Sequence, residues 1–295
     1  MILPGRTLGI VGGGQLGRMF ALRAREMGYR IVVLEPDPRS PAGAVADHQI
    51  EAAYDDQGAL EELVERTDAI TTEFENVSAD ALAFLERFRP VRPSSAAVRI
   101  VQNRVTEKAH LLEAGFRTAP FHPVLTAGDL GAALRAVGTP ALLKTARLGY
   151  DGKGQAPVAS DLDAAAAFES LRGSACILER RLNLELELSV VVARGSDGAI
   201  APFSVGENLH IDGILDSTVV PARIPVSTAH AATGMAAAVA ASLDYVGVLG
   251  VELFVADGGQ LFVNEVAPRP HNSGHYTMDA CTVDQFEQQV RALCG

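Results

Sequence analysis

The chain has 295 residues, of which 48% are hydrophobic and 21% charged, and this composition is typical of a globular protein rather than a disordered one. Its 25 Lys and Arg against 36 Asp and Glu give a net charge of −11, which argues against sequence-independent binding to nucleic acid, because such binding needs a basic surface. A small anionic ligand is compatible with this balance, since a few local cations and backbone N–H groups can hold a phosphate.

The chain shows no sign of export or of a membrane span. The start, Met1 to Arg6, lacks a basic segment followed by an apolar run, and the three cysteines are few and without metal-binding spacing. The most apolar later region, 229–256, is interrupted by Asp244, Glu252 and several glycines. We therefore expect a soluble cytoplasmic protein with neither a membrane nor a nucleic acid as partner.

The first part of the chain alternates short apolar runs with helical patterns. The runs predict strands at 8–11, 31–34 and 69–72, and the helical patterns fall at 15–27, at 58–66 and from Ser78, whose hydroxyl can cap its helix. Strands that alternate with helices are typical of parallel βαβ units. We expect a first module of parallel α/β type, residues 1–101.

Beyond residue 101 strands become more frequent. Helices are predicted at 102–114, 126–137, 161–171, 228–243 and 283–293, and strands at 141–144, 176–179, 188–193, 200–205, 218–222 and in a hairpin over 246–266. Runs of strands broken by single helices suggest an α+β module, residues 102–295.

A glycine-rich turn, Gly12 to Gly17, follows the first strand and precedes a helix. Its pattern fits G-x-G-x-x-G, and Glu35 ends the next strand at the distance typical of a dinucleotide-binding unit. The pattern alone is weak, because nothing later supplies a nicotinamide site and the first module looks too short for both halves of such a fold. An NAD site, a plain tight turn and another phosphate-bearing ligand stay open, and we favour the last.

A second glycine-rich turn, Gly149 to Gln155, follows the strand that carries Lys144. Such a loop can close over a polyphosphate with its N–H donors, while the lysine supplies a point charge. The alternative is a flexible turn with a solvated lysine.

Two glutamates, Glu252 and Glu265, lie within the apolar strands of the predicted hairpin. If Gly258-Gly259 is a two-residue turn, they are direct cross-strand partners, with Cα atoms about 4.5–5.5 Å apart. Opposed carboxylates destabilise a half-buried sheet unless one is protonated or a cation lies between them. Mg²⁺, which phosphate oxygens also hold, is the natural cation. The alternative places both side chains on an exposed face.

The segment after Glu265, residues 267–275, is dense in hydrogen-bond donors. It contains Arg269, whose planar fork suits a carboxylate or bicarbonate, and His271, which can donate or move a proton. Glu179 and Glu187 flank a strand junction, where they could bind a nucleobase or a ribose, or simply be solvated acids.

Five segments together resemble the ATP-grasp superfamily and, within it, the N5-carboxyaminoimidazole ribonucleotide synthetases. They are residues 12–19 (GGGQLGRM), 72–77 (TEFENV), 149–155 (GYDGKGQ), 208–215 (NLHIDGIL) and 264–275 (NEVAPRPHNSGH), in family order. The resemblance implies an ATP-grasp fold, with a Rossmann-like pre-ATP-grasp domain at 1–101 and a two-lobed ATP-grasp domain at 102–295 whose lid is the loop 149–155. The small C-terminal β-rich domain of this family is expected to be absent or truncated here.

The resemblance also implies which residues form the site. The ATP contacts would be Arg104, Lys144, Gly149, Tyr150, Asp151, Gly152, Lys153, Gly154, Gln155, Glu179, Arg180, Arg181, Leu182, Glu187, His210, Asn264 and Glu265. Glu252 and Glu265 would hold magnesium. The substrate would be bordered by Gln15, Leu16, Glu73, Tyr150 and Asp151 and held by Arg269, His271, Asn272 and Ser273, with Arg269, His271, Asp151 and Lys144 as the catalytic residues.

The activity implied by the resemblance is a ligase reaction of de novo purine biosynthesis. The enzyme would use ATP and Mg²⁺ to carboxylate aminoimidazole ribonucleotide with bicarbonate through carboxyphosphate, most simply as a homodimer. Asp151 and His271 are both candidates for the group that takes the amine proton. The alternatives are another ATP-grasp ligase such as the formate-dependent glycinamide ribonucleotide transformylase, an NAD-dependent oxidoreductase, and a nucleotide-binding module without activity.

Overall fold

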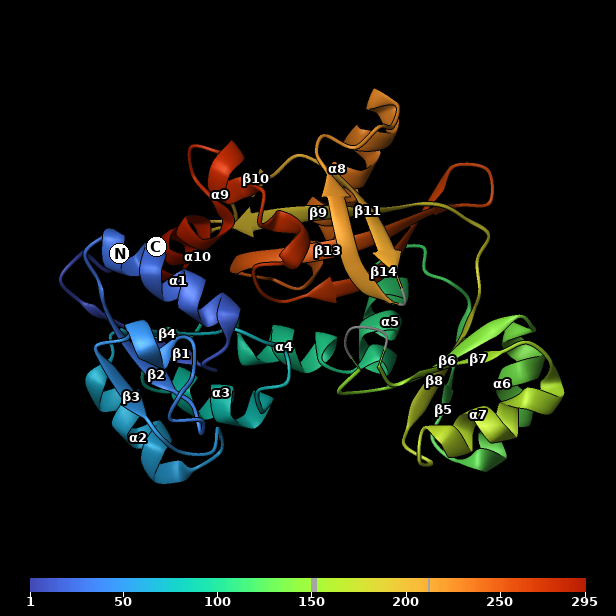
Figure 1. The fold of residues 1–295 in the computed structure, drawn as a ribbon, viewed down its shortest axis with the longest axis horizontal. Helices are drawn as coiled ribbons and strands as arrows, with labels where there is room; N and C mark the ends of the chain where they lie inside the picture. The colour runs from blue at the N-terminus through green and yellow to red at the C-terminus, as the bar shows by residue number, and fades with distance from the viewer. Residues whose placement is uncertain (150–152, 212) are drawn as a thin grey trace.

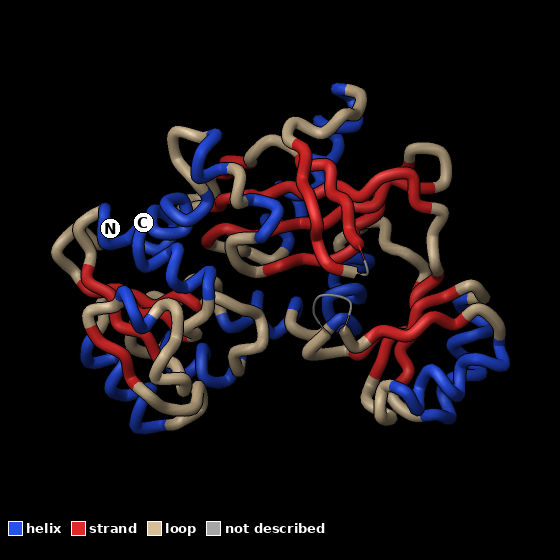
Figure 2. Tube along the Cα trace, viewed as in Figure 1, coloured by secondary structure: helices blue, strands red, loops and turns tan. Residues whose placement is uncertain are grey.

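The computed structural model describes residues 1–149, 153–211 and 213–295, and within these ranges the strands form three sheets. A parallel sheet lies at the N-terminal end, a small antiparallel sheet lies on the opposite side, and a larger antiparallel sheet lies above both (Figure 1). The helices α4 (Ser95–Val101) and α5 (Arg104–Glu113) run between them. The tube view shows helices around the N-terminal sheet and on one side of the small sheet (Figure 2).

The N-terminal sheet is parallel throughout, which confirms the expected βαβ units. Its order is β3-β2-β1-β4, and the elements are β1 (Thr7–Val11), α1 (Gln15–Glu26), β2 (Arg30–Leu34), β3 (His48–Ile50), α2 (Gln57–Arg66), β4 (Ala69–Thr72) and α3 (Ala79–Glu86). Ser78 caps α3 by accepting from the Ala81 N–H, as its hydroxyl predicted. The short polar β3 was not predicted, because three residues carry no periodicity.

The helix predicted at 102–114 is confirmed as α5, whereas the short helix before it, α4, was not predicted. The Asn103 side chain accepts a hydrogen bond from the Val105 N–H at 2.9 Å and caps α5. This cap turns the chain, so that α5 leaves the N-terminal unit and packs against the large sheet.

The small sheet has the order β5-β8-β6-β7 and is antiparallel. Its elements are β5 (Phe121–Val124), α6 (Leu130–Val137), β6 (Ala141–Thr145), β7 (Gln155–Val158), α7 (Ala164–Ser170) and β8 (Cys176–Arg180). Both helices cover one face and close a core that includes Leu143, Leu178 and Phe168. The capping boxes of Thr126 and Ser160 begin short 3-10 turns before α6 and α7.

The large sheet has the order β12-β11-β9-β13-β14, with β10 beside β9. Its elements are β9 (Leu184–Arg194), β10 (Ile200–Pro202), β11 (Gly206–Ile211), β12 (Ile214–Val219), β13 (Gly247–Ala256) and β14 (Gln260–Ala267), and α8 (Val226–Ser242) packs on it. The strand expected at 200–205 is confirmed only over 200–202, as β10, and that expected at 218–222 only over 218–219, as the end of β12.

The chain ends on the first module rather than on the large sheet alone. After α9 (Thr277–Ala280), the helix α10 (Gln285–Cys294) packs beside α1, and Phe286 and Val290 share a core with Leu8 and Ile10. The two termini therefore lie close together (Figure 1). None of the described helices is long and apolar enough to cross a membrane.

Candidate active site

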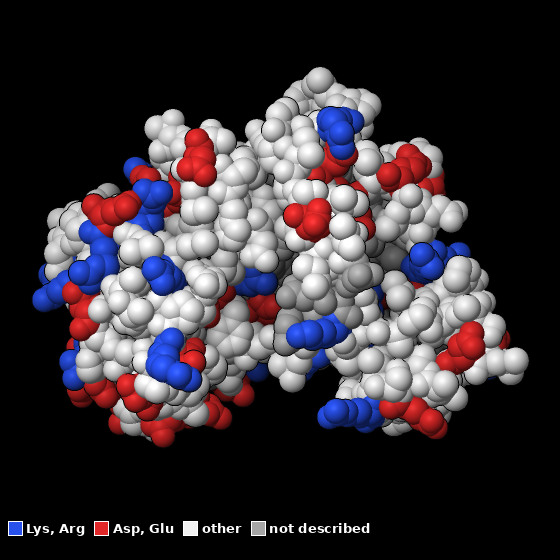
Figure 3. Space-filling model, viewed as in Figure 1, with Lys and Arg blue, Asp and Glu red and all other residues white. Residues whose placement is uncertain are grey.

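A cleft of about 1190 Å³, including the solvent at its mouth, opens between the small and the large antiparallel sheets. The space within it that is open to water measures about 290 Å³, which lies at the lower end of the roughly 300–1,000 Å³ common for small-ligand pockets. Many of the predicted site residues line it, namely Arg104, Lys144, Gly149, Lys153, Gly154, Gln155, Glu187, His210, Glu252, Asn264, Glu265, Arg269, His271 and Asn272. In the space-filling view, a recess beside the N-terminal unit contains both basic and acidic side chains (Figure 3).

Glu252 on β13 and Glu265 on β14 are direct cross-strand partners, as predicted. The predicted two-residue turn is wrong, however. From Leu253–Val263 to Ala256–Gln260 the register leaves three connecting residues, 257–259, all with positive φ. One extra residue, Asn264, then forms a bulge in β14 that restores the pairing of the two glutamates.

The two carboxylates differ in their electrostatic surroundings. Burial raises the pKa of Glu252 to about 7, and the neighbouring Glu265 carboxylate acts in the same direction. Burial also acts to raise the pKa of Glu265, but the Arg104 guanidinium, whose Nη1 lies 2.7 Å from Glu265 Oε2, holds it at about 2. The sheet therefore contains one firmly ionised carboxylate beside one that is reluctant to ionise.

A hard cation fits between these groups. Asn264 donates from Nδ2 to Glu252 Oε2 at 3.2 Å, and its Oδ1 is buried without a hydrogen-bond partner. Two opposed carboxylates and a buried amide oxygen are the donor set that Mg²⁺ prefers. The described part of the chain has no group of three or more His, Cys, Asp or Glu that could hold a metal ion.

Lys144 on β6 lines the cleft and forms an ion pair with Glu179 on β8. The Nζ atom lies 2.6 Å from Glu179 Oε2, and Glu179 is 3% exposed. Burial opposes ionisation of Glu179, but Lys108 and Lys144 together bring its pKa down to about 2. Glu179, expected as a nucleotide contact, thus turns its carboxylate toward two lysines.

The other hinge residues contribute less to the cleft than expected. The Arg180 side chain is exposed on the opposite face of β8 and donates from Nε to the Val137 carbonyl at 2.8 Å. The Arg180 and Arg181 backbone N–H groups donate to the Pro120 and Pro140 carbonyls. The structure therefore does not bring these two arginine side chains into the cleft, and Leu182, which is half-buried, lies outside its lining.

The C-terminal end of the predicted lid loop is fixed to β6. The Thr145 N–H donates to the Gly154 carbonyl at 2.7 Å. Gly154 has a φ of +74°, and a Cβ there would come within 2.5 Å of Thr145 Oγ1, so only glycine fits. Three predicted site residues of this loop, Tyr150, Asp151 and Gly152, lie outside the described residues.

Glu187 on β9 and His210 on β11 form an ion pair on the far wall of the cleft. His210 Nδ1 lies 2.5 Å from Glu187 Oε2, and this hydrogen bond raises the pKa of His210. The pairing engages one carboxylate oxygen of Glu187, which was expected to bind the ribose of the nucleotide.

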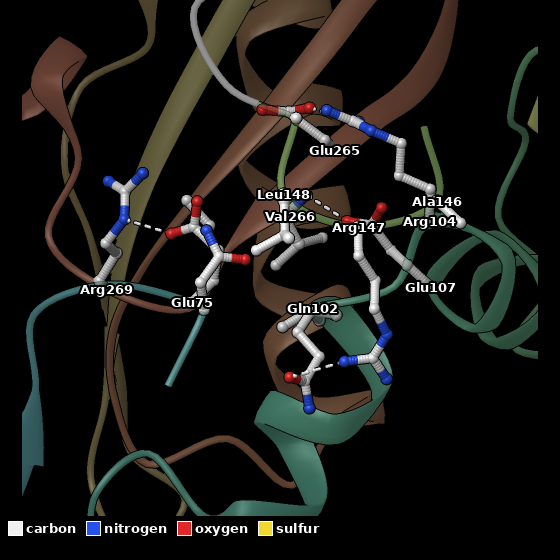
Figure 4. Close-up of a pocket in the computed structure, with 14 residues that line it drawn as sticks. Glu75, Gln102, Arg104, Glu107, Ala146, Arg147, Leu148, Glu265, Val266 and Arg269 are labelled. Atoms are coloured by element: carbon white, nitrogen blue, oxygen red, sulfur yellow. Dashed lines mark hydrogen bonds and ion pairs between the residues drawn. The ribbon is translucent and has the colours of Figure 1, made fainter. Parts of the chain in front are cut away.

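The loop after β14 brings Arg269 and His271 to the cleft. Figure 4 shows Arg269 and Arg104 each facing a carboxylate, and Arg269 Nε lies 2.7 Å from Glu75 Oε2. These pairs border both the main cleft and a smaller adjoining cavity. Both arginines predicted to bind anions are thus paired with glutamates of the chain itself.

The His271 ring contacts a neighbour on each side. Its Nδ1 accepts from the backbone N–H of Ser273 at 3.3 Å, and its Nε2 lies 3.4 Å from Glu252 Oε1. Burial, with the Arg269 charge, lowers the pKa of His271 to about 4. Ser273, expected as a substrate contact, is 2% exposed, and its hydroxyl lies 2.8 Å from His271 Nδ1.

The first glycine-rich turn is occupied by acids of the chain. The Gly13 N–H donates to Glu35 at 2.7 Å, and the Gly14 and Gly17 N–H groups donate to Glu73. A carboxylate thus occupies the helix N-terminus that a pyrophosphate would need, which removes the ground for an NAD site. Glu73 faces this turn rather than the main cleft.

Three buried or half-buried charges at the site were missed from the sequence: Glu75, Glu107 and Lys108. Arg104, Glu107, Lys108 and Leu111 follow the i, i+3, i+4, i+7 spacing, so the charges share the helix face of a buried leucine. That spacing was the available signal for the α5 pair. For Glu75 no signal existed beyond its place in the 72–77 segment.

Comparison with known proteins places these features in context. Residues 109–286 match the ATP-grasp domain family, and residues 5–102 match the ribonucleotide synthetase preATP-grasp domain family. The N5-carboxyaminoimidazole ribonucleotide synthase of Brucella melitensis is 50% identical over 294 residues, which are 99% of this chain and 81% of that protein.

Two solved structures carry the likeness to the fold. A crystal structure of an N5-carboxyaminoimidazole ribonucleotide synthetase with ADP is 44% identical, with a TM-score of 0.96 over 100% of this chain and 78% of that one. The Aspergillus clavatus enzyme, in complex with ADP and 5-aminoimidazole ribonucleotide, is 30% identical, with a TM-score of 0.91 over 98% of this chain and 76% of that one.

Proposed function

Because the chain belongs to the N5-carboxyaminoimidazole ribonucleotide synthase family of ATP-grasp enzymes, we propose that its cleft brings ATP, magnesium, bicarbonate and aminoimidazole ribonucleotide together. The reaction is the ATP-dependent carboxylation of aminoimidazole ribonucleotide to N5-carboxyaminoimidazole ribonucleotide in purine biosynthesis, and ATP and Mg²⁺ take part in it. The observation that carries the assignment of roles is the opposed pair Glu252 and Glu265 beside Arg104 and Lys144 in one cleft.

The first step makes bicarbonate a usable electrophile. A bicarbonate oxygen attacks the γ-phosphorus of ATP, the bond to the β,γ-bridging oxygen breaks, and ADP leaves with the electron pair. Lys144 and Arg104 hold the phosphoryl oxygens as their negative charge shifts, and the ends of the 149–155 loop cover them. A magnesium ion held by Glu252, Glu265 and Asn264 would neutralise phosphate charge there.

The second step forms the carbon–nitrogen bond. The exocyclic amine attacks the carbon of carboxyphosphate. The bond between this carbon and the bridging oxygen breaks, and phosphate leaves with that oxygen. Arg269 supplies a planar pair of donors for the carboxylate of the carboxylated product. To bind it, the guanidinium gives up its ion pair with Glu75. A water-poor site is needed, since carboxyphosphate hydrolyses readily.

The group that accepts the amine proton is proposed to be Asp151 or His271. His271 lies beside Glu252 and Ser273 in the cleft, where it also orients the carbon unit.

Isotope transfer tests the carboxyphosphate route. With bicarbonate labelled by ¹⁸O, the oxygen that attacks phosphorus stays on phosphate when the C–O bond breaks. Each released phosphate should carry one ¹⁸O, measured by mass spectrometry. Unlabelled phosphate formed together with the carboxylated product would rule the route out.

The ribonucleotide is proposed to lie between the first glycine-rich turn and the loop after β14. Leu16 and Glu73 share a small apolar cavity with Pro270, so the first glycine-rich turn lies against the loop that carries Arg269 and His271. This contact supports the proposed place of Gln15, Leu16 and Glu73 at the border of the substrate.

The domain boundaries, the oligomeric state and the cellular compartment are also proposals. We propose a pre-ATP-grasp domain of residues 1–101 and an ATP-grasp domain of 102–295, supported by their separate cores, with α10 shared between them. A cytoplasmic homodimer is proposed from the family, and the three free cysteines agree with a reducing compartment.

Replacing Arg269 with alanine should separate nucleotide binding from carboxylation. Arg269 pairs with Glu75 and lies outside the lysine and carboxylate cluster, so MgATP affinity should change less than about threefold, while carboxylation falls by about 10²-fold or more. Calorimetry and a coupled ADP assay measure the two effects. Arg99→Ala, which removes a surface arginine paired with Asp80, is the control, and equal loss of binding and turnover in Arg269→Ala would contradict the assignment.

Binding of magnesium nucleotide should release a proton near neutral pH. The pKa of Glu252 is raised to about 7, so the free protein holds this proton below pH 7 and a metal ligand must lose it. Affinity should therefore rise with pH, by up to about tenfold per unit below pH 7, and level off above about pH 8. Calorimetry in buffers of different ionisation enthalpy measures the released proton, and the same release in Glu252→Gln would contradict the role of this carboxylate.

A further inference from the structure

The most deeply buried cation beside the cleft is not part of the site as described so far. Lys108 on α5 is 1% exposed, although an isolated buried ammonium group is costly. Its Nζ lies 3.3 Å from Glu179 Oε1 and 3.4 Å from the Val263 carbonyl of β14. Lys108 therefore contacts both the small and the large sheet from a buried position.

The contacts of α5 link the two sides of the cleft. Lys108 reaches β8 of the small sheet through Glu179, and β14 of the large sheet through Val263. The preceding residue, Glu107, accepts from the Val266 N–H at 2.6 Å, next to the metal-binding Glu265. One turn of helix therefore contacts both the strand that carries Glu265 and the strand that supports Lys144.

Glu179 lies between two ammonium groups. Its Oε2 is 2.6 Å from Lys144 Nζ and its Oε1 is 3.3 Å from Lys108 Nζ. One negative charge thus faces two positive ones, so the cluster keeps a net charge of one at the cleft wall. Without Lys108, Glu179 would neutralise Lys144, and a phosphate would have to compete with a buried carboxylate for it.

We propose that Lys108 is a positioning residue for the phosphate site, which shares Glu179 with Lys144 and so leaves Lys144 with positive charge for the terminal phosphates of ATP. The inference rests on the proposed function, since it concerns the same nucleotide site. Lys108 itself is separated from the cleft by Glu179 and touches neither ATP nor the reacting atoms.

The test separates loss of the Lys108 charge from a change in the shape of the binding site. Calorimetric titrations measure the affinity for ATP and for adenosine, which lacks phosphates. Lys108→Met removes the charge and keeps the side-chain length, so ATP binding should weaken on the order of tenfold, with adenosine binding changed less than about twofold. The double variant Lys108→Met with Glu179→Gln restores the net charge of one. Its affinity for ATP should return to within about threefold of wild type.

Each outcome bears on a different claim. Unchanged ATP binding in Lys108→Met, equal weakening of ATP and adenosine, or no recovery in the double variant would each overturn the inference. A wild-type chain that binds no ATP would instead overturn the proposed function. If Lys108→Met does not fold, as judged by its melting transition, Glu179→Gln alone decides. It raises the cluster's charge, so ATP should bind at least as tightly as to wild type, and weaker binding would overturn the inference.

Discussion

Replacing Glu265 with glutamine should lower the rate of ADP formation by about 10³-fold. Glu265 is the carboxylate of the opposed pair that stays ionised, because Arg104 holds its pKa at about 2. A bound metal contributes several kcal/mol to the stabilisation of a phosphoryl transition state, and each ~1.4 kcal/mol is tenfold in rate. Glutamine keeps the shape but loses the charge that binds the metal. A coupled ADP assay at saturating ATP measures the loss.

The control for this variant is Glu169→Gln, which neutralises an exposed glutamate on α7, away from the cleft. Its turnover should stay within about twofold of wild type. Since Glu265 contributes to the raised pKa of Glu252, the Glu265→Gln variant should also lower the pKa of Glu252. A Glu265→Gln enzyme with undiminished ADP formation would refute the metal assignment.

Replacing Lys144 with methionine should lower ADP formation by about 10²- to 10³-fold. The ammonium group of Lys144, held at 2.6 Å from Glu179, is a fixed cation of β6 in the lining of the cleft, where we propose that the phosphates bind. Removal of one preorganised charge from a transition-state oxygen typically costs roughly 10²- to 10³-fold. The loss should be larger in kcat than in the affinity for adenosine, which has no phosphate for Lys144 to hold.

Arg135→Met is the matched control, because Arg135 is an exposed cation on α6 of the same lobe. It should leave ADP formation within about twofold of wild type. Arg135→Met should melt as wild type does, whereas Lys144→Met should melt at a lower temperature, because it leaves the buried Glu179 carboxylate with Lys108 alone. A Lys144→Met enzyme that makes ADP at the wild-type rate would show that Lys144 is only a partner for Glu179.

The sequence predicted the carboxylate pair correctly but for a reason that the structure corrects. The alternation of apolar residues and the glycine pair at 258–259 indicated a hairpin, and the pairing of Glu252 with Glu265 followed. The connecting loop has three residues rather than two, and Asn264 compensates as a bulge. A bulge depends on how a strand twists against its neighbours, so no local pattern could have revealed it.

Helices and strands with strong periodicity could be predicted from the sequence. Ion pairs and hydrogen bonds between residues far apart in the sequence could not. Residues 8–11, 31–34 and 69–72 form strands as expected, because apolar runs between helices leave few other folds. Glu73 accepts hydrogen bonds from the glycine-rich turn, and Glu179 forms ion pairs with two lysines. In both cases the partners are far apart in the sequence. Lys108 was within reach of prediction, since its spacing from Leu111 places it on the buried helix face.

The measurement that tests the assignment of this cleft most directly is ADP release with ATP and Mg²⁺, with aminoimidazole ribonucleotide and bicarbonate each left out in turn. A site that makes carboxyphosphate and then transfers its carbon to the amine predicts fast ADP release only when both are present. ADP release that ignores bicarbonate, or that responds to formate in its place, would contradict the account.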